Sequence, residues 1–346
     1  MTVHTVLVTG GAGFIGSNFI RHLLANYSYN IINLDKLTYA GNLENLADVS
    51  GDKRYRFVQG DIGDAEVVGK LMSEADAVVS FAAESHVDRS IEDPGTFIQT
   101  DVYGTFVLLD AARRSDIERF LHISTDEVYG QSIGDQRFKE DDPFRPRSPY
   151  AASKAGGELQ VHAFRETYDL PVVIARPANN IGPFQYPEKA VPLFTINAIE
   201  DEPLPVYGKG LQIRDRLYVD DHCKALDLLL HEGELGEAYN ISADNERSNI
   251  EVVKTILEML EKPTSLIRFV EDRLGHDERY SMDATKIRAL GWSADHDFEA
   301  AMDKTVSWYR EHREWWEPIK SGEYREYYQR MYSQRLAEAT PYEEAG

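Results

Sequence analysis

The sequence has little cysteine, no long apolar run and a shortage of cationic side chains. Cys223 is the only cysteine in 346 residues, which excludes an intrachain disulfide and a cysteine metal cluster. No apolar stretch reaches the length that spans a bilayer. The first residues lead straight into an apolar strand without the basic region of a leader peptide. We therefore expect a cytoplasmic protein.

Basic residues are outnumbered: 37 Lys and Arg stand against 59 Asp and Glu, giving a net charge of -22. Such a field repels nucleic acid and anionic membranes, so neither is expected as a partner. An acidic surface is ordinary for a soluble enzyme, and it is also typical of adaptation to high salt, where ions screen the repulsion. Full activity and an intact fold in dilute buffer would exclude the second interpretation. An anionic substrate would need a local cluster of arginines.

Short apolar runs alternate with helical patterns in the first half of the chain. Apolar runs at 4–9, 30–35, 55–60, 76–81, 119–124 and 171–176 predict strands, and periodic segments at 14–27, 65–72, 94–114 and 149–168 predict helices. Strands separated by helices of this length are typical of βαβ units. The fold class expected is therefore α/β, with a doubly wound parallel Rossmann sheet.

The second half is less regular. Residues 179–182 open a loop-rich stretch with several prolines. We expect a Rossmann domain over 1–178, which can take back strands from the second half, a smaller mixed α/β lobe over 179–336, and a tail over 337–346 without regular structure. Further helices are expected at 220–231, 250–260 and, rich in aromatic side chains that pack rather than bind nucleic acid, 308–335, with an extended segment at 238–241.

A glycine motif follows the first strand. Gly10, Gly13 and Gly16 suit a tight turn, the approach of backbone to a pyrophosphate and close packing of a helix on the strand. Asp35 ends the second strand, where it can bond a ribose 2'-hydroxyl and repel a 2'-phosphate, so NAD is favoured over NADP. Asp61–Ile62 follows the third strand and can border an adenine, although for Asp61 a helix cap is an equal alternative.

A tyrosine and a lysine share one face of the helix predicted at 149–168. Tyr150 and Lys154 are four residues apart, which places them side by side. An ammonium beside a phenol favours the phenolate, and a phenolate near neutral pH can take a proton from a sugar hydroxyl. Ser124–Thr125, at the end of a predicted strand, completes this pattern.

Together these motifs resemble the extended short-chain dehydrogenase/reductase family of NAD-dependent epimerases and dehydratases. Within it, four strings resemble the dTDP-glucose 4,6-dehydratases. They are DKLTYAGN at 35–42, AAESHVDRS at 82–90, STDEVYG at 124–130 and YGKGLQIRD at 207–215. The resemblance runs from about residue 4 to 332, and its most telling string is the third, because epimerases of the superfamily lack the two acids there.

The resemblance implies a lyase that converts dTDP-glucose to dTDP-4-keto-6-deoxyglucose and water, for deoxysugar biosynthesis such as that of dTDP-rhamnose. Tightly bound NAD oxidises C4, water leaves across C5–C6, and C6 is reduced. The family assigns Tyr150, with Thr125 and Lys154, to the C4 hydroxyl. It assigns Asp126 as the acid for the C6 hydroxyl and Glu127 as the base at C5. Adjacent carboxylates disfavour double ionisation, so one of them can stay protonated at neutral pH.

Further site residues are implied by the same resemblance. For the cofactor they are Gly10, Gly13, Phe14, Ile15, Gly16, Asp35, Lys36, Asp61, Ile62, Ala82, Ala83, Ser85, Thr100, Tyr150 and Lys154. For the nucleotide-sugar substrate, bound in the smaller lobe, they are Ser85, His86, Thr125, Asn179, Arg214, Asn249, Arg273 and His276. The family also pairs two subunits through a four-helix bundle, which implies a homodimer built on 94–114 and 149–168. No metal is expected, because the contiguous residues 220–223 cannot all converge on one ion.

The chain departs from the family pattern in ways that leave the nucleotide base open. Thymine, uracil and another base all remain candidates. Two other functions also stay open: a nucleotide-sugar 4-epimerase, which needs no acid pair, and a non-enzymatic NAD-binding regulator, which typically loses Tyr or Lys. The departures are Asp101 for Asn, Ala178 for Ser, Ile181 for Tyr and, flanking the expected nucleotide pocket, Arg216 for Trp, Leu274 for Pro and Glu278 for Arg.

Overall fold

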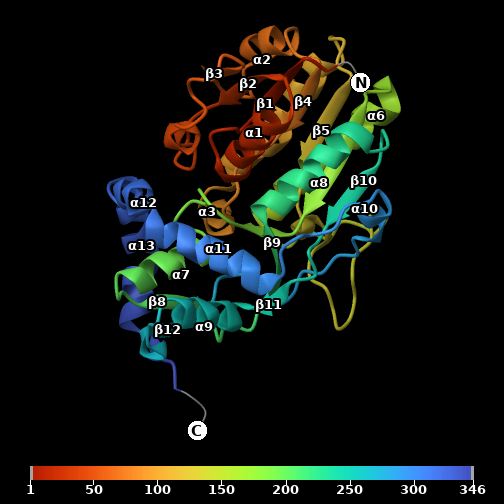
Figure 1. Cartoon of the computed structure of the whole chain (residues 1–346). Coiled ribbons are helices and arrows are strands. Elements are labelled where there is room, and N and C mark those ends of the chain that lie inside the picture. The colour runs from red at the N-terminus through yellow and green to blue at the C-terminus, as the bar shows by residue number, and fades with distance from the viewer. Residues whose placement is uncertain (1–2, 344–346) are drawn as a thin grey trace.

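Seven parallel strands form the central sheet of the computed structural model, which describes residues 3–343 (Figure 1). Their order is β10-β6-β5-β4-β1-β2-β3. The six strands predicted in the first half are confirmed, and the segment expected to be extended at 238–241 returns to this sheet as its edge strand. The strands are β1 (Thr5–Thr9), β2 (Asn30–Asp35), β3 (Tyr55–Gln59), β4 (Ala77–Ser80), β5 (Arg119–Ile123), β6 (Val172–Pro177) and β10 (Ala238–Ile241).

The strand order reverses beside β1. The chain runs outward from β1 through β2 to β3, then returns to place β4 on the other side of β1. At such a switch point the helices that follow the two central strands leave in opposite directions, which opens a crevice at the carboxyl ends of the strands. A ligand site is therefore expected at the ends of β1 and β4.

Helices cover both faces of the sheet, as the alternating pattern predicts. α1 (Phe14–Asn26) and α8 (Val219–Glu232) lie on one face, and α2 (Ala65–Met72) and α6 (Pro149–Tyr168) lie on the other (Figure 1). Among the described residues no helix is both apolar enough and long enough to pass through a membrane.

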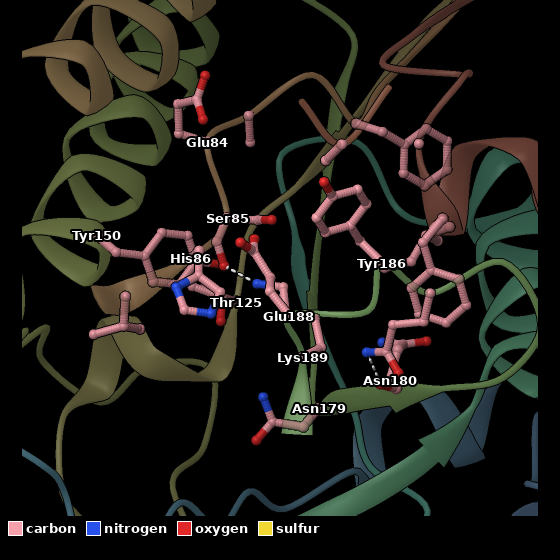
Figure 2. A pocket seen from close by; sticks show the side chains of 18 of the residues that line it. Glu84, Ser85, His86, Thr125, Tyr150, Asn179, Asn180, Tyr186, Glu188 and Lys189 are labelled. Atoms are coloured by element: carbon pink, nitrogen blue, oxygen red, sulfur yellow. Dashed lines mark hydrogen bonds between the residues drawn. The ribbon is translucent and has the colours of Figure 1, made fainter. Parts of the chain in front are cut away.

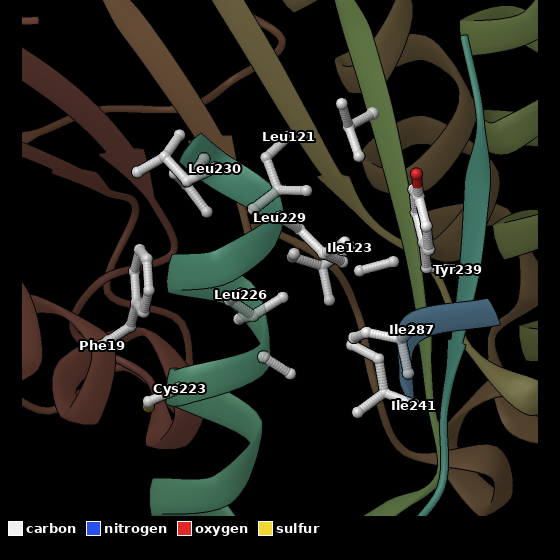
Figure 3. Packing of buried hydrophobic residues seen from close by; sticks show 14 of the residues in the cluster. Phe19, Leu121, Ile123, Cys223, Leu226, Leu229, Leu230, Tyr239, Ile241 and Ile287 are labelled. Carbon is white, nitrogen blue, oxygen red and sulfur yellow. The ribbon is translucent and has the colours of Figure 1, made fainter. Parts of the chain in front are cut away.

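Successive residues of β5 feed two separate cores. Leu121 and Ile123 point to the α8 face, where they meet Leu226 and Leu229 (Figure 3). Phe120 points the opposite way into the core beneath α2 and α6. This alternation follows from the two-residue period of a strand. A strand buried on both faces therefore reads as a continuous apolar run, which is why the sequence located it.

The segment 94–114 is not the single α-helix expected. It begins as α4 (Pro94–Phe97), widens to the π-helical η2 (Ile98–Gly104) and ends as α5 (Thr105–Ala112). A π turn shifts the register of the side chains that follow it and occurs frequently beside functional sites. Here it carries the buried Asp101.

Two small sheets and five longer helices build the smaller lobe. The sheets have the orders β11-β9-β7 and β13-β12-β8. α7 was missed because its Pro192 counted toward the stretch expected to be loop-rich. Pro192 lies in the first turn of the helix, where the missing backbone N–H breaks no helical hydrogen bond. The elements are β7 (Asn179–Ile181), β8 (Leu204–Tyr207), β9 (Ile213–Tyr218), β11 (Glu246–Ser248), β12 (Ile267–Val270), α7 (Ala190–Ile199), α9 (Asn249–Met259), α11 (Phe298–Glu311), α12 (Arg313–Ile319) and α13 (Glu323–Ala337).

The aromatic segment 308–335 is broken into three helices rather than one. α11 ends at Glu311, and Gly322, with φ +58°, precedes α13. Trp316 of α12 is fully buried, and its indole N–H donates to the backbone oxygen of Tyr309 (2.7 Å), which agrees with a packing role for these aromatics.

The C-terminal tail differs from the expectation for 337–346. Ala337 ends α13, and β13 (Thr340–Pro341) pairs antiparallel with β12. Residues 344–346 lie outside the described residues.

Candidate active site

One cavity of about 430 Å³ opens at the carboxyl ends of β1 and β4, between the two lobes (Figure 2). It gathers residues that are far apart in the sequence, and nearly every predicted site residue lines it. These are Gly10, Gly13, Phe14, Ile15, Gly16, Asp35, Lys36, Asp61, Ile62, Ala82, Ala83, Ser85, His86, Thr100, Thr125, Glu127, Tyr150, Lys154, Asn179, Arg214, Asn249, Arg273 and His276.

The glycine turn leaves no room for side chains. Gly10 has φ +72°, and a Cβ there would lie 2.6 Å from the backbone nitrogen of Ala82. A Cβ on Gly16 would lie 2.5 Å from the backbone oxygen of Gly10. Gly13 is the N-cap of α1 and carries no side chain to bond the first amides. These amides face the cavity at the positive end of the helix dipole, an arrangement that fits the pyrophosphate of NAD.

Gly16→Ala is expected to destabilise the fold by about 1–3 kcal/mol and to lower the amount of NAD that copurifies with the protein. The new methyl group meets backbone rather than a movable side chain, so α1 must shift away from the strand. Thermal unfolding and the absorbance of released cofactor measure both effects. Gly69→Ala in α2 is the matched control, because nothing lies within 4 Å of its Cβ position. Equal NAD content in the two variants would contradict this account.

Asp35 lies at the adenosine end of the cavity. Its two carboxylate oxygens accept from the backbone nitrogens of Ala12 (2.9 Å) and Leu37 (2.8 Å). These bonds fix the carboxylate while each oxygen keeps a lone pair, so it fits the ribose role that favours NAD. Lys36 pairs with Asp61 (2.6 Å) at the rim. The cap of α2 is provided by Asp64 rather than by Asp61, which was the alternative for that residue.

Tyr150 and Lys154 project from α6, whose N-terminus Ser148 caps by accepting from the backbone nitrogen of Ala151 (3.1 Å). The ammonium of Lys154 donates to the backbone oxygen of Ile123 (2.7 Å). Burial, with the charges of Glu127 and Asp101, raises the pKa of Tyr150 well above its usual range. This is opposite to the lowering expected, because burial and the nearby carboxylates favour the neutral phenol. The positive charge of a bound nicotinamide acts in the other direction.

The acid pair lies on the short helix η3 (Asp126–Tyr129), beside Tyr150. Both carboxyls are buried. Burial and the charge of Glu127 raise the pKa of Asp126 to about 7, so its acid form persists near neutral pH. Burial also raises the pKa of Glu127, which the cations Arg273, Arg214 and Lys189 oppose. That one member of the pair keeps its proton at neutral pH stays a prediction, in line with the direction of these shifts.

Known proteins resemble this chain in both sequence and structure. The family model described as GDP-mannose 4,6 dehydratase matches residues 7–305. The chain belongs to this family.

Individual members show how close the match is. The Haloferax volcanii protein named low-salt glycan biosynthesis protein Agl12 is 54% identical over 88% of this chain and 98% of its own. The dTDP-glucose 4,6-dehydratase of Neisseria meningitidis serogroup B is 49% identical over 92% and 97%. The crystal structure of DesIV, a dTDP-glucose 4,6-dehydratase from Streptomyces venezuelae with NAD bound, superposes with a TM-score of 0.89 at 48% identity, over 91% and 100%.

Among the described residues, Asp126 is the one predicted site residue that does not line the cavity. Its Oδ1 accepts a hydrogen bond from the hydroxyl of Thr125 (3.1 Å), and Thr125 does line the cavity. The carboxyl of Asp126 is therefore joined to the cavity lining by one hydrogen bond, through Thr125. Neither the spacing nor the resemblance indicated this connection.

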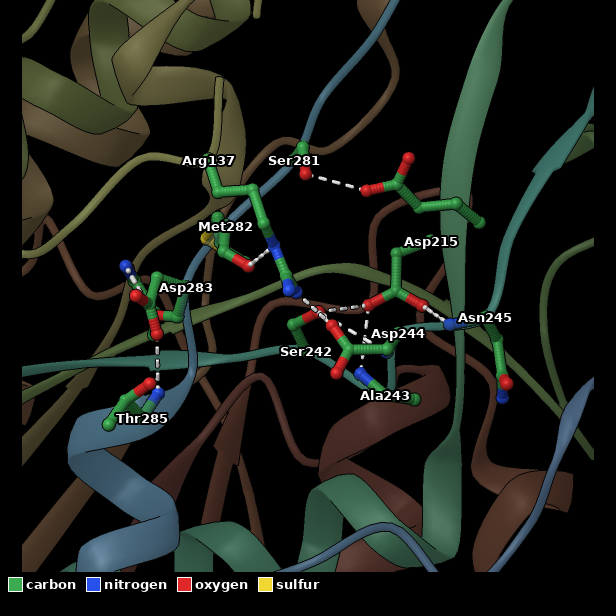
Figure 4. Close-up of polar contacts among 12 residues, drawn as sticks. Arg137, Asp215, Ser242, Ala243, Asp244, Asn245, Ser281, Met282, Asp283 and Thr285 are labelled. Atoms are coloured by element: carbon green, nitrogen blue, oxygen red, sulfur yellow. Dashed lines mark hydrogen bonds and ion pairs between the residues drawn. The ribbon is translucent and has the colours of Figure 1, made fainter. Parts of the chain in front are cut away.

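The arginines of the smaller lobe form the local cationic patch that the acidic sequence requires. Arg214 and Arg216 both line the cavity from β9. Between them, Asp215 points the other way and accepts from the hydroxyl of Ser242 (2.7 Å) and the backbone nitrogen of Asn245 (2.8 Å) (Figure 4). This anchor holds the strand so that both guanidinium groups face the cavity, as the two-residue period requires.

Three further predicted residues complete this end of the cavity. The side chain of Asn249 accepts from Arg216 (2.7 Å). Arg273 lies 3.7 Å from the carboxylate of Asp88. Burial and Arg273 lower the pKa of His276 to about 4, so its ring is neutral near pH 7. The site thus offers arginine forks, which suit phosphate oxygens.

The departures from the family pattern fall in two groups. Ala178, Ile181 and Arg216 line the cavity. Among the described residues, Leu274 and Glu278 do not, and Leu274 is 80% exposed. Arg216 is therefore the departure near the nucleotide end that the structure brings into the site. Asp101 lies behind the site, where it accepts from the hydroxyl of Ser153 (2.5 Å).

Sequence reasoning missed Glu188 and Lys189, which line the cavity near Thr125 (Figure 2). The ammonium of Lys189 donates to the backbone oxygen of Ser85, and Glu188 pairs with Arg89 (2.9 Å). Both residues lie directly before α7, at the end of the preceding loop. They were missed because that helix was not predicted. The adjacent Glu188–Lys189 pair after Pro187 was the available signal.

The string 220–223 is part of α8. Asp221 accepts from the backbone nitrogen of His296 (3.0 Å), and the His222 ring bonds the side chain of Asn180 (2.9 Å). Asp221 therefore ties α8 to the loop that carries His296, and His222 ties it to β7.

Proposed function

We propose that this protein is an NAD-dependent dTDP-glucose 4,6-dehydratase, a hydro-lyase that forms dTDP-4-keto-6-deoxyglucose and water. The observation that carries the proposal is the buried Asp126–Glu127 pair beside Tyr150 and Lys154. Relatives with the dehydratase name at nearly half identity, and a solved dehydratase with NAD bound, support it. We place the reaction in the cytoplasm, where the lone buried thiol of Cys223 stays reduced.

NAD, when bound at the glycine turn, supplies the group that accepts hydrogen from C4 and returns it to C6. The chain supplies the proton transfers. Tyr150 takes the proton of the C4 hydroxyl, because it is the phenol that lies beside the cavity wall at Thr125. Lys154, which is buried, orients a ribose of the bound NAD and keeps a positive charge near that phenol.

Water elimination requires a base at C5 and an acid at the C6 hydroxyl. Glu127 lines the cavity and faces three cations that favour its ionised form, so it is the base. Burial and the charge of Glu127 raise the pKa of Asp126 to about 7, which leaves part of it protonated near neutral pH, so it is the acid. The ketone at C4 acidifies the C5 proton, which brings its removal within reach of a carboxylate.

An epimerase remains the alternative in the same superfamily. An epimerase requires the 4-keto sugar to rotate within the site, and it needs no acid pair. The burial of Asp126 and Glu127 next to the phenol therefore argues for dehydration. Burying two carboxyls costs stability, and a role in the reaction explains why the site keeps them.

Incubation of the NAD-loaded protein with dTDP-glucose tests the proposal. NMR of the product is expected to show a 4-keto-6-deoxy sugar. UDP-glucose and GDP-mannose, supplied separately, test the base that Arg216 helps to select. Recovery of dTDP-galactose would replace dehydration by epimerisation, and inertness toward all three sugars would contradict an enzymatic role.

We further propose a homodimer formed through α5 and α6. Large apolar side chains are exposed on these two adjacent helices and on η2: Tyr103 is 48%, Phe106 39%, Leu159 57% and Tyr168 52% exposed. Two helices from each of two copies would bury these residues in a four-helix bundle.

Phe106→Glu is expected to convert the dimer into a monomer, because it would place a charge in the apolar contact. Sedimentation velocity measures the change. Ile133→Glu is the matched control, since Ile133 is also exposed, at 77%, but lies outside α5 and α6. A monomeric wild-type protein would contradict the proposal.

A further inference from the structure

The guanidinium of Arg216 is buried in the cavity wall with only a neutral partner. Arg216 is 5% exposed and lines the cavity from β9. Its Nη2 donates to Oδ1 of Asn249 (2.7 Å), and its Nε is buried without a hydrogen-bond partner among the described residues. Burial and the charge of Arg214 lower the pKa of Arg216 to about 10, so the side chain is still charged at pH 7. A buried charge without compensation is costly.

Two carboxyl groups attract Arg216, but neither neutralises it. Asp215 is turned to the other side of β9, where it accepts from the hydroxyl of Ser242 (2.7 Å) and the backbone nitrogen of Ala243 (2.8 Å) (Figure 4). Asp126 also attracts the guanidinium, but its pKa of about 7 leaves it partly protonated. Within the part of the chain that the structure describes, neither carboxyl forms an ion pair with Arg216. A bound anion is therefore the counter-charge that the cavity can offer.

Arg214, two residues earlier on the same face of β9, is bonded in the same way. Its Nη1 and Nη2 donate to the backbone oxygens of Ile213 (2.7 Å) and Asp277 (2.7 Å), and its guanidinium lies over the ring of Tyr280, 4.0 Å from the centroid. Two neighbouring guanidinium groups thus have neutral partners, and their like charges repel each other. An anion placed between them would relieve this repulsion and accept from both.

The substrate class of the proposed function, on which this inference rests, has its negative charge only on the diphosphate, because the base, the pentose and the hexose are neutral. Arg216 lies toward the hexose end: β9 pairs with β7 so that Arg216 is opposite Asn179, and Asp126 of the acid pair is among the charges that it faces. The β-phosphate is bonded to C1 of the hexose, and C1 and C5 flank the ring oxygen. The β-phosphate is therefore the phosphate nearer to the acid pair.

We propose that Arg216 binds the β-phosphate of the nucleotide sugar and makes the site selective for nucleoside diphosphates over monophosphates. Its unpaired Nε is a ready donor to a phosphate oxygen, and Arg214 beside it is a second cation for the same group. A tryptophan, which is usual at this position in the family, has one N–H and no charge, so this contact belongs to the present chain. Arg216 influences the choice of base through the phosphate that it holds, because that phosphate sets where the nucleoside lies.

Arg216→Met tests this contact, because methionine is a long unbranched side chain without charge or N–H donors. The Kd values of dTDP and dTMP for the NAD-loaded protein are measured by titration calorimetry. The Kd of dTDP is expected to rise about 10–100-fold, the usual worth of a hydrogen bond to a charged group. The Kd of dTMP, which lacks the β-phosphate, is expected to rise less than about threefold, since only the screened long-range charge is lost.

Arg247→Met is the matched control, because it removes the same charge from the neighbouring strand. Arg247 of β11 lies opposite Arg214 and pairs with Glu299 (3.6 Å), but it does not line the cavity, as far as the described residues go. Both Kd values are expected to stay at those of the wild type. Thermal unfolding and bound NAD show whether Arg216→Met is folded. If it is not, Arg216→Gln, which is uncharged but polar, takes its place with the same expectation.

An equal rise in both Kd values would overturn the proposal, because Arg216 would then contact the α-phosphate or the base. An unchanged Kd of dTDP would overturn it as well. Wild-type protein that binds dTDP but forms no 4-keto-6-deoxy sugar would contradict the proposed function alone, whereas protein that binds neither nucleotide would contradict both.

Discussion

Glu127→Gln is expected to lower kcat by about 10²–10⁴-fold, the usual contribution of a placed acid or base, while reduced cofactor still accumulates. Glutamine has the shape of glutamate and can accept from Tyr280, so the site keeps its form. Oxidation at C4 needs only Tyr150 and NAD, and the sequence then stops for want of a base at C5. Stopped-flow absorbance of the reduced nicotinamide measures the accumulation.

Asp126→Asn provides the matched contrast for this prediction. It removes the acid and leaves the base, so elimination should slow while Glu127 still exchanges the C5 proton. With dTDP-glucose deuterated at C5, loss of deuterium into recovered substrate is expected for Asp126→Asn and not for Glu127→Gln. Deuterium loss from both variants, or normal turnover of Glu127→Gln, would contradict the assignment of the base.

Local patterns made much of the fold predictable. Except for the edge strand β3, the strands of the central sheet are largely buried on both faces, so each is a short apolar run. The helices between them are marked by apolar residues at helical spacing. The smaller lobe was less predictable because its strands are two to six residues long and pair across long loops. The π turn at 98–104 was also invisible, since one extra residue per turn barely changes the apolar pattern.

The candidate site was predictable as a set of residues but not as an arrangement. Tyr150, Lys154 and the glycine turn come from short motifs whose spacing carries the geometry. The hydrogen bond between Thr125 and Asp126 depends on the side-chain conformations of a short helix, which no spacing encodes. The raised pKa of Tyr150 depends on burial, on Glu127 and on the distant Asp101, none of which entered the argument from Lys154 and the nicotinamide.

Beyond the reacting groups, α6 depends on a buried ion pair that holds it to the sheet. Glu158 lies one turn after Lys154, and its Oε1 accepts from Nε (2.9 Å) and Nη2 (2.5 Å) of Arg176 on β6. The two side chains are 0% and 2% exposed. Burial opposes the ionised form of Glu158, but bonds from His162 and Arg176 outweigh it and lower its pKa to about 2. The pair therefore remains ionised at every pH at which the enzyme works.

Arg176→Met is expected to lower the free energy of unfolding by about 3–5 kcal/mol, because it leaves a buried carboxylate without its counter-charge. Urea unfolding of the wild type and the variant measures the loss. The double variant Glu158→Leu with Arg176→Met is expected to recover most of it, since two apolar side chains of similar volume replace the pair. Since the unpaired glutamate would regain stability by binding a proton, the deficit of Arg176→Met should shrink as the pH falls. A deficit below about 1 kcal/mol, or a double variant as unstable as the single one, would show that the ion pair does not secure the helix that carries Tyr150 and Lys154.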